Sequence, residues 1–135
     1  MPNISFSTMQ EHNTINPYVT PPHQLIVELY VRNLRASCAF YQQLGFQLVR
    51  DDGDFVELQW EDSLLFLEEV PDAPPPPSYP VGNLRIMVPN VDDHWILAQK
   101  MGAQVLRSFE NRSYGLRDFT IVAPDGLGLR FATRL

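Results

Sequence analysis

The sequence predicts an α+β protein built from two tandem βαβββ modules that form a curved mixed sheet around a cleft. Apolar, β-branched runs and one helix-like run follow each other in the same order in both halves of the chain. In addition, residues 31–50 and 88–107 align without a gap at a constant offset of 57 residues. Two copies are too few for a solenoid, which needs at least three. We therefore expect two half-sheets that close around a shared cleft.

The two aligned stretches share residues that start and stop helices. Six of the twenty aligned pairs are identical: Val31/Val88, Asn33/Asn90, Gln42/Gln99, Gly45/Gly102, Gln47/Gln104 and Arg50/Arg107. Asparagine is a favoured helix N-cap, and a glycine just after a helix accepts a positive φ. The repeated Asn and Gly predict that both helices begin and end at equivalent positions.

Each half is expected to place one helix after its first strand. In the first half, the strands are predicted at residues 24–31, 46–52, 55–60 and 63–70, with the helix at 34–44. In the second half, the strands are predicted at 83–88, 103–109, 117–123 and 127–133, with the helix at 91–101. Short turns such as "DDGD" and "PDG" separate the strands.

The length of 135 residues favours one domain. We expect an N-terminal arm at residues 1–23, either loose or packed on a neighbour, and a single domain at 24–135. Its modules, 24–70 and 83–135, are joined by a proline-rich linker at 71–82. Proline lacks the backbone donor of a sheet ladder and favours extended chain, so this segment predicts a stiff crossover.

Composition limits the partners that the chain suits. The net charge of −6 argues against nucleic acid or an anionic membrane as a partner. No stretch approaches the length of a membrane span, and the N-terminus lacks a signal-peptide pattern. The single cysteine, Cys38, lies among apolar helix residues, which favours a packing role and a reducing compartment. We expect a cytoplasmic protein.

Alternation along the strands predicts which side chains face the cleft. In the first strand, Leu25, Val27, Leu29 and Val31 share an apolar face that should pack on the helix. The opposite face carries residues whose counterparts in the fifth strand follow from the repeat: Ile26/Asn83, Glu28/Arg85 and Tyr30/Met87. A charge in a cavity is costly unless it is paired or solvated. Glu28 and Arg85 therefore form an ion pair, lie at a wet rim, or anchor a polar ligand.

Aromatic residues are further candidates for the cleft wall. Small-molecule sites combine apolar walls with a few polar groups, so Trp60, Tyr114 and Phe119 are candidate lining residues. Tyr114 lies in a glycine-containing loop and is the better functional candidate. Core packing is the default for Phe119 and for Trp95.

The segments "LYVRNLRASCAFYQQLGF" and "YGLRDFTIVAPDG" resemble characteristic segments of the glyoxalase/bleomycin resistance protein/dioxygenase superfamily, also called vicinal oxygen chelate. The resemblance covers residues 24–133 and implies the glyoxalase/bleomycin resistance fold. Tyr114 stands at a usual Trp and Ala123 at a usual Asp. The scaffold hosts many chemistries, so the resemblance alone leaves the activity open.

Metal-dependent members of this family hold the ion with His, Glu or Gln from the first, fourth, fifth and eighth strands. By resemblance, these positions fall on Ile26, on Asn83, on Arg130 and on Phe66 or Glu68, according to the fourth-strand register. Ile26 has no donor atom, and Arg130 repels a cation. A catalytic divalent site needs about three His or carboxylate ligands. We therefore predict no metal and no cofactor.

The three histidines are not expected to replace the missing ligands. His12 lies in the arm, His23 has the opposite strand parity to Ile26, and His94 lies in the first turn of the second helix. Each is interpreted as a surface or capping residue.

The resemblance is to the metal-free, bleomycin-resistance-like branch of the family. It implies a small-molecule binding protein that holds a polar or anionic ligand between the modules, and it implies a homodimer. The candidate ligand-binding residues are Glu28, Tyr30, Arg85, Met87, Tyr114, Arg130 and Trp60. Arg130 suits an anionic ligand group, or alternatively pairs with Glu28 or Glu68.

Two other functions stay open. One is a glyoxalase/dioxygenase-type lyase, isomerase or oxygenase with a displaced metal site, or with Glu28 as a general base beside Arg85. No catalytic residue is assigned. The other is a structural or protein-binding module that uses the arm and the proline segment.

Overall fold

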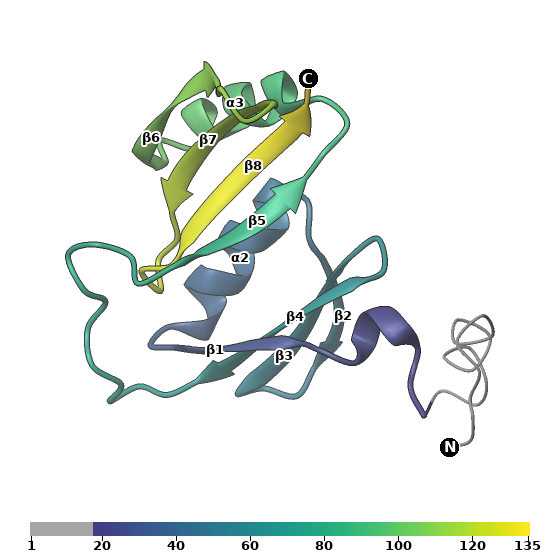
Figure 1. Ribbon diagram of the computed structural model, residues 1–135. Coiled ribbons are helices and arrows are strands. Elements are labelled where there is room, and N and C mark those ends of the chain that lie inside the picture. The colour runs from purple at the N-terminus through teal and green to yellow at the C-terminus, as the bar shows by residue number, and fades with distance from the viewer. Residues whose placement is uncertain (1–17) are drawn as a thin grey trace.

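The computed structural model describes residues 18–135, which form two tandem βαβββ modules (Figure 1). A short 3-10 helix, η1 (Pro21–His23), precedes them. The first module contains β1 (Val27–Val31), α2 (Leu34–Leu44), β2 (Gln47–Asp51), β3 (Phe55–Trp60) and β4 (Ser63–Glu69). The second contains β5 (Asn83–Met87), α3 (Val91–Lys100), β6 (Gln104–Asn111), β7 (Leu116–Val122) and β8 (Gly128–Arg134). The predicted fold class is confirmed.

Each module forms its own four-stranded mixed sheet. The strand orders are β1-β4-β3-β2 in the first sheet and β5-β8-β7-β6 in the second. The first strand of each module pairs in parallel with the last, and the other pairs are antiparallel. This shared topology confirms the duplication that the 57-residue offset predicts.

The repeated residues cap the helices as expected. The Asn33 side chain accepts a hydrogen bond from the Ala36 N–H at 3.0 Å, and the Asn90 side chain accepts one from the Asp92 N–H at 3.1 Å. Gly45 and Gly102 follow the two helices with φ of 132° and 67°. These are backbone conformations that glycine adopts without steric cost.

One hydrophobic core joins the two modules. It contains the helix-facing residues of both sheets, such as Leu58, Leu67 and Phe131, all fully buried. Helix α2 lies between the two sheets in Figure 1. The Tyr41 hydroxyl on this helix donates to Asp125 Oδ2 at 2.7 Å, in the turn before β8. Within residues 18–135, α2 and α3 pack on the core face of the sheets, and we call the opposite face of each sheet its open face.

Both modules carry a β-bulge at the same place. The register shifts between Leu48 and Arg50 in β2, and between Val105 and Arg107 in β6. A bulge inserts one extra residue and re-aims the side chains that follow. Arg50 and Arg107 consequently lie on the open faces of their sheets.

The proline-rich linker connects β4 to β5 without a helix or strand of its own. It packs on the second module: a Cβ added at Gly126 would lie 2.6 Å from the Cβ of Pro76. Residues 1–17 of the predicted arm, including His12, lie outside the described residues. None of the helices in residues 18–135 has the length and hydropathy to cross a membrane.

Candidate functional site

Arginines cross the open face of the second sheet in one row. Arg85 on β5 lies opposite Arg130 on β8, Arg130 lies opposite Thr120 on β7, and Thr120 lies opposite Arg107 on β6. Neighbouring strands are about 4.8 Å apart, so Arg85 and Arg130 are adjacent. Arg107 lies two strands from Arg130 and three strands from Arg85. Arg134 follows two residues after Ala132 on β8 and so shares the same face.

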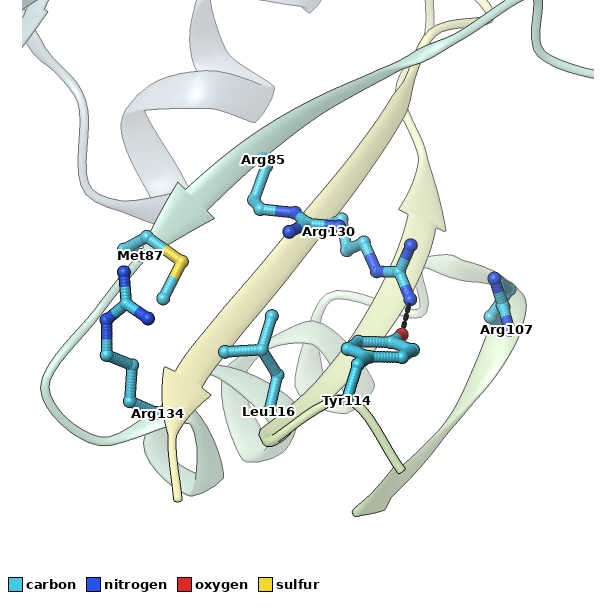
Figure 2. Close-up of a pocket in the computed structure, with 7 residues that line it drawn as sticks. All are labelled: Arg85, Met87, Arg107, Tyr114, Leu116, Arg130 and Arg134. Atoms are coloured by element: carbon cyan, nitrogen blue, oxygen red, sulfur yellow. Dashed lines mark hydrogen bonds between the residues drawn. The ribbon is translucent and has the colours of Figure 1, made fainter. Parts of the chain in front are cut away.

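These arginines surround a cavity of about 590 Å³, which we call the arginine cavity (Figure 2). Its lining residues are Arg85, Met87, Arg107, Tyr114, Leu116, Arg130 and Arg134. A volume of this order is typical of a small-molecule site. The lining places four guanidinium groups beside one aromatic ring and two apolar side chains.

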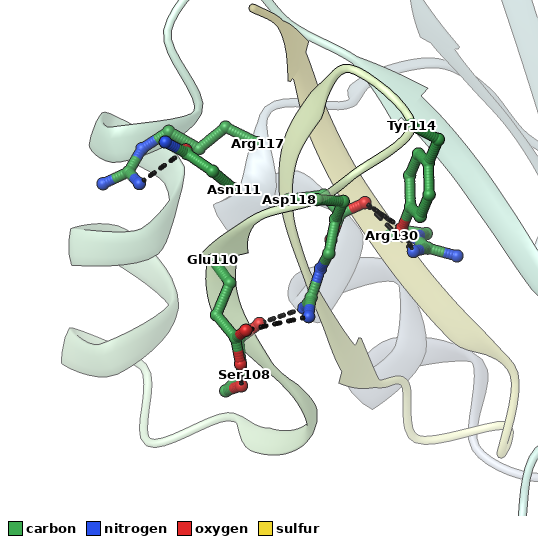
Figure 3. Close-up of polar contacts among 8 residues, drawn as sticks. Ser108, Glu110, Asn111, Tyr114, Arg117, Asp118 and Arg130 are labelled. Atoms are coloured by element: carbon green, nitrogen blue, oxygen red, sulfur yellow. Dashed lines mark hydrogen bonds and ion pairs between the residues drawn. The ribbon is translucent and has the colours of Figure 1, made fainter.

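Asp118 holds Arg130 in place beneath this cavity (Figure 3). The Asp118 carboxylate is fully buried and accepts hydrogen bonds from Arg130 Nε at 3.0 Å, from Arg112 Nε at 2.7 Å and from the Tyr114 hydroxyl at 3.0 Å. The Tyr114 hydroxyl in turn accepts a hydrogen bond from Arg130 Nη2. Arg130 and Tyr114 are therefore fixed before any ligand arrives.

The network also sets the ionisation of Asp118. Burial alone raises the pKa of this carboxyl group, but hydrogen bonds from Arg112, Tyr114 and Arg130 outweigh burial and hold the pKa below its ordinary value of 3.8. Asp118 is consequently ionised at neutral pH, and its charge is shared between Arg112 and Arg130.

The other three arginines of the cavity have no such partner. Within residues 18–135, Arg85, Arg107 and Arg134 make no ion pair. Arg50, the repeat counterpart of Arg107, pairs with Glu57 on the neighbouring strand and with Asp52. The residue on the neighbouring strand is glutamate in the first module and threonine in the second, so at this repeat position Arg50 is paired and Arg107 makes no ion pair within residues 18–135.

A second cavity, of about 360 Å³, adjoins the first. We call it the apolar cavity, and its lining residues are Val27, Phe46, Trp60, Glu61, Ser63, Leu64, Leu65, Leu84, Arg85, Ile86 and Met87. The Trp60 ring packs edge-on against Phe46, and it lies so close to Gly45 that a Cβ there would approach it to 2.8 Å. Arg85 and Met87 line both cavities.

The structure brings together four of the seven candidate ligand residues. Arg85, Met87, Tyr114 and Arg130 line the arginine cavity, and Trp60 lines the neighbouring apolar cavity. Glu28 is exposed on β1, opposite Phe66 in the first sheet, and does not line the cavity that contains Arg85. Tyr30 lines a small separate pocket beside the linker, with Pro74 and Pro76 among its neighbours.

Arg107, Leu116 and Arg134 line the cavity although the sequence did not predict them as ligand residues. Two signals in the sequence point to the arginines. Arg107 is one of the identical repeat residues, and strand alternation from Arg130 leads to Arg134. Leu116 has no such signal.

The predicted carboxylate partners of Arg130 were wrong. Arg130 pairs with Asp118, on the neighbouring strand, and not with Glu28 or Glu68. The sequence alone does not predict this pair, because Asp118 and Arg130 are brought together by the register of β7 against β8.

Other side-chain predictions have clear outcomes. Phe119 is fully buried on the helix-facing side of β7, and Trp95 packs against it, so both belong to the core as expected. His94 is not a surface cap: its ring stacks on Phe131 at 5.0 Å between centroids.

Burial raises the pKa of the Cys38 thiol, with the charge of Asp51 adding to the effect, and a packing role fits this environment.

The residues at the family's metal positions do not fit a divalent-metal centre. Asn83 lies opposite Gly128 and Glu68 lies opposite Tyr30, so neither has a His or carboxylate as this strand partner. Arg130 is a cation that is already paired with Asp118. In residues 18–135, no group of three or more His, Cys, Asp or Glu side chains is placed to hold a metal ion.

The duplicated topology agrees with a comparison of this sequence with models of protein families. A family model described as the Glyoxalase/Bleomycin resistance protein/Dioxygenase superfamily matches residues 22–131. The chain belongs to this superfamily. No curated protein sequence matches the chain.

Solved structures of the superfamily share the fold. A glyoxalase/bleomycin resistance protein/dioxygenase from Nocardioides has a TM-score of 0.70 at 17% identity, covering 97% of this chain and 94% of its own. A bleomycin resistance determinant encoded on transposon Tn5 has a TM-score of 0.64 at 24% identity, with coverages of 82% and 97%. A bleomycin-binding protein complexed with bleomycin has a TM-score of 0.64 at 22% identity, with coverages of 83% and 98%. At 17–24% identity, these similarities show that the chain shares the fold of these proteins.

Proposed function

We propose that this superfamily member is a bleomycin-resistance-like binding protein that holds a polar or anionic small molecule in the arginine cavity without a metal ion. One observation carries the proposal. Four arginines line the cavity, and of these only Arg130 has an ion-pair partner in the described residues. Guanidinium groups suit carboxylate and phosphate, and they repel cations. An anionic group would relieve their mutual repulsion.

The donor chemistry supports metal independence. The family's metal positions carry an isoleucine, an asparagine and an arginine, together with the uncertain position at Phe66 or Glu68. An arginine in the cavity opposes a divalent cation by charge alone. The buried thiol of Cys38 is compatible with a reducing, cytoplasmic setting.

We also propose a homodimer in which the first sheet's open face of one copy lies beside the arginine cavity of the other copy and leaves the cavity open to the ligand. The first sheet's open face carries Glu28 and Glu68, together with the Glu57–Arg50 pair. The second sheet's open face carries the arginine row. Faces of opposite charge favour association and register between copies.

The dimer is tested by light scattering during size-exclusion chromatography. We expect a dimer for the unmodified protein and weaker association for Glu28→Lys. The matched control is Asp72→Lys, which reverses an exposed carboxylate in the linker. A monomeric unmodified protein, or equal weakening by both variants, would contradict the proposed interface.

The binding function is tested by thermal shift with a panel of organic anions, neutral analogues and bleomycin, with and without a chelator. We expect organic anions to stabilise the protein equally in both conditions. The Arg107→Met variant should lose the effect, whereas Arg50→Met should keep it, because Arg50 is neutralised in the other sheet.

Elemental analysis of protein purified without a chelator completes the test. Stoichiometric zinc, nickel, iron or manganese would overturn metal independence. Stabilisation that is the same for anions and neutral analogues, or that survives Arg107→Met, would overturn the anionic ligand.

A further inference from the structure

We propose that the ligand is an amphipathic organic anion, whose anionic group lies in the arginine cavity and whose apolar chain or ring lies in the apolar cavity. This inference rests on the proposed function, because it specifies the ligand of the same site. It follows from the way in which the two cavities meet.

The two cavities meet at strand β5. Arg85 and Met87 line both, and β5 is the edge strand of the second sheet. At an edge strand, a bound molecule can pass from the open face around the side of the sheet without crossing the backbone. The Met87 side chain is 43% exposed at this crossing and is flexible enough to pack against varied apolar shapes. One molecule can therefore occupy both cavities and contact Arg85 between them.

The chemistry of the walls changes along this path. The arginine cavity presents four guanidinium groups, whereas most of the side chains around the apolar cavity are aliphatic or aromatic, including Phe46, Trp60 and Leu64. Burial of an apolar chain there removes its surface from water, which favours binding.

Charge also sets the direction of the ligand. Glu61 is the one carboxylate among the residues that line the apolar cavity, and it is exposed in the turn between β3 and β4. A negative charge at that position disfavours an anionic group at the apolar end. The arginines favour it at the opposite end. The anionic group is therefore held on one side of β5 and the apolar part on the other.

Isothermal titration calorimetry with a homologous series tests the proposal. The probes are acetate, butyrate, hexanoate and octanoate, with octyl phosphate and neutral 1-octanol as comparisons. We expect the carboxylates to bind roughly fourfold more tightly per added methylene group, the change typical of burying one CH₂. The neutral alcohol should bind about tenfold or more weakly than octanoate, because it lacks the charge-assisted contacts. The stronger of octanoate and octyl phosphate identifies the preferred anionic group.

Two variants separate the two ends of the ligand. Arg107→Met should weaken octanoate and butyrate by the same factor, because both carry the anionic group. Leu64→Gln keeps the side-chain size in the apolar cavity and adds an amide there. It should weaken octanoate more than butyrate and so flatten the dependence on chain length, and an unchanged circular dichroism spectrum shows that the variant is folded. Arg50→Met is the control for the loss of an arginine outside the cavity.

The outcomes are distinct. Binding that depends on both Arg107 and chain length supports the inference. Binding that depends on Arg107 but is equal for butyrate and octanoate overturns the amphipathic ligand and leaves the proposed function in place. Binding that ignores Arg107, or no binding of any anion, overturns both.

Discussion

Arg85 and Arg130 are cross-strand neighbours in the parallel β5–β8 ladder, with both guanidinium groups on the same open face of the sheet (Figure 2). Asp118 shares its single negative charge between Arg130 and Arg112, and Arg85 makes no ion pair within residues 18–135. Like charges in directly opposed positions destabilise a sheet. The second module therefore retains an unfavourable pair that a bound anion would relieve.

This relationship predicts that Arg85→Met stabilises the ligand-free protein. Methionine keeps an apolar stem and removes the charge, so the free energy of unfolding should rise by roughly 0.2–1 kcal/mol at low salt. The gain should shrink at high salt, because the repulsion is screened there. Urea denaturation at two ionic strengths measures it. A loss of stability at low salt would show that Arg85 makes a favourable contact instead.

Removal of the Asp118 carboxylate should be strongly destabilising. Asp118→Asn leaves Arg112 and Arg130 without their shared buried counter-charge, and loss of one partner of a buried pair costs about 3–5 kcal/mol. Denaturant unfolding at pH 7 measures the cost. Asp72→Asn, an exposed carboxyl change in the linker, should have little effect. Similar costs for the two variants would contradict the central role of Asp118.

The same variant has a defined pH dependence. The pKa of Asp118 is lower in the folded protein than its ordinary value of 3.8. Its contribution is therefore fully present above about pH 4 and is lost as pH falls through the folded pKa. The stability difference between the unmodified protein and Asp118→Asn should be constant from pH 5 to pH 7 and should narrow only in stronger acid. Unfolding curves across this range give the difference directly, and narrowing between pH 5 and pH 7 would contradict the lowered pKa.

The Tyr41–Asp125 hydrogen bond should stabilise the contact between the modules. The Tyr41 ring is fully buried, and burial, together with the charge of Asp125, raises the pKa of its phenol. Tyr41→Phe removes a hydrogen bond to a charged group, which should lower the unfolding free energy by about 1.5–3 kcal/mol. Tyr79→Phe changes an exposed tyrosine and serves as the control. Equal unfolding midpoints for the two variants would show that the contact contributes nothing.

Gly45 should tolerate a side chain less well than Gly53. Both have positive φ, but a Cβ at Gly45 would lie 2.8 Å from Trp60, whereas a Cβ at Gly53 would meet nothing within 4 Å. Gly53→Ala therefore reports backbone strain alone. Gly45→Ala adds overpacking of about 1–3 kcal/mol, and denaturant unfolding gives the difference. Because Trp60 lines the apolar cavity, Gly45→Ala should also change tryptophan fluorescence; equal costs with unchanged fluorescence would contradict the close contact.

Much of the fold could be predicted because its signals are local. Asn33 and Asn90 cap their helices, Gly45 and Gly102 follow them, and alternation along β1 and β5 separates the core face from the open face. The residues of the candidate site could be predicted only in part from such local signals. Arg85 and Met87 followed from alternation and repeat, but Glu28, their expected neighbour, lies in the other sheet and outside the arginine cavity.

The sequence by itself determined the duplication, the order of the elements, the alternation of faces along β1 and β5, and the presence of arginines on the open face of the second module. Capping and alternation depend on residues only a few positions apart, so they can be deduced from the chain. Only the tertiary structure decided that Asp118 pairs with Arg130, that Thr120 rather than a glutamate lies opposite Arg107, and that Arg85 joins a charged cavity to an apolar one. These relationships depend on strand register, on bulges and on the packing of one module against the other, and they bring together residues that are distant in the sequence.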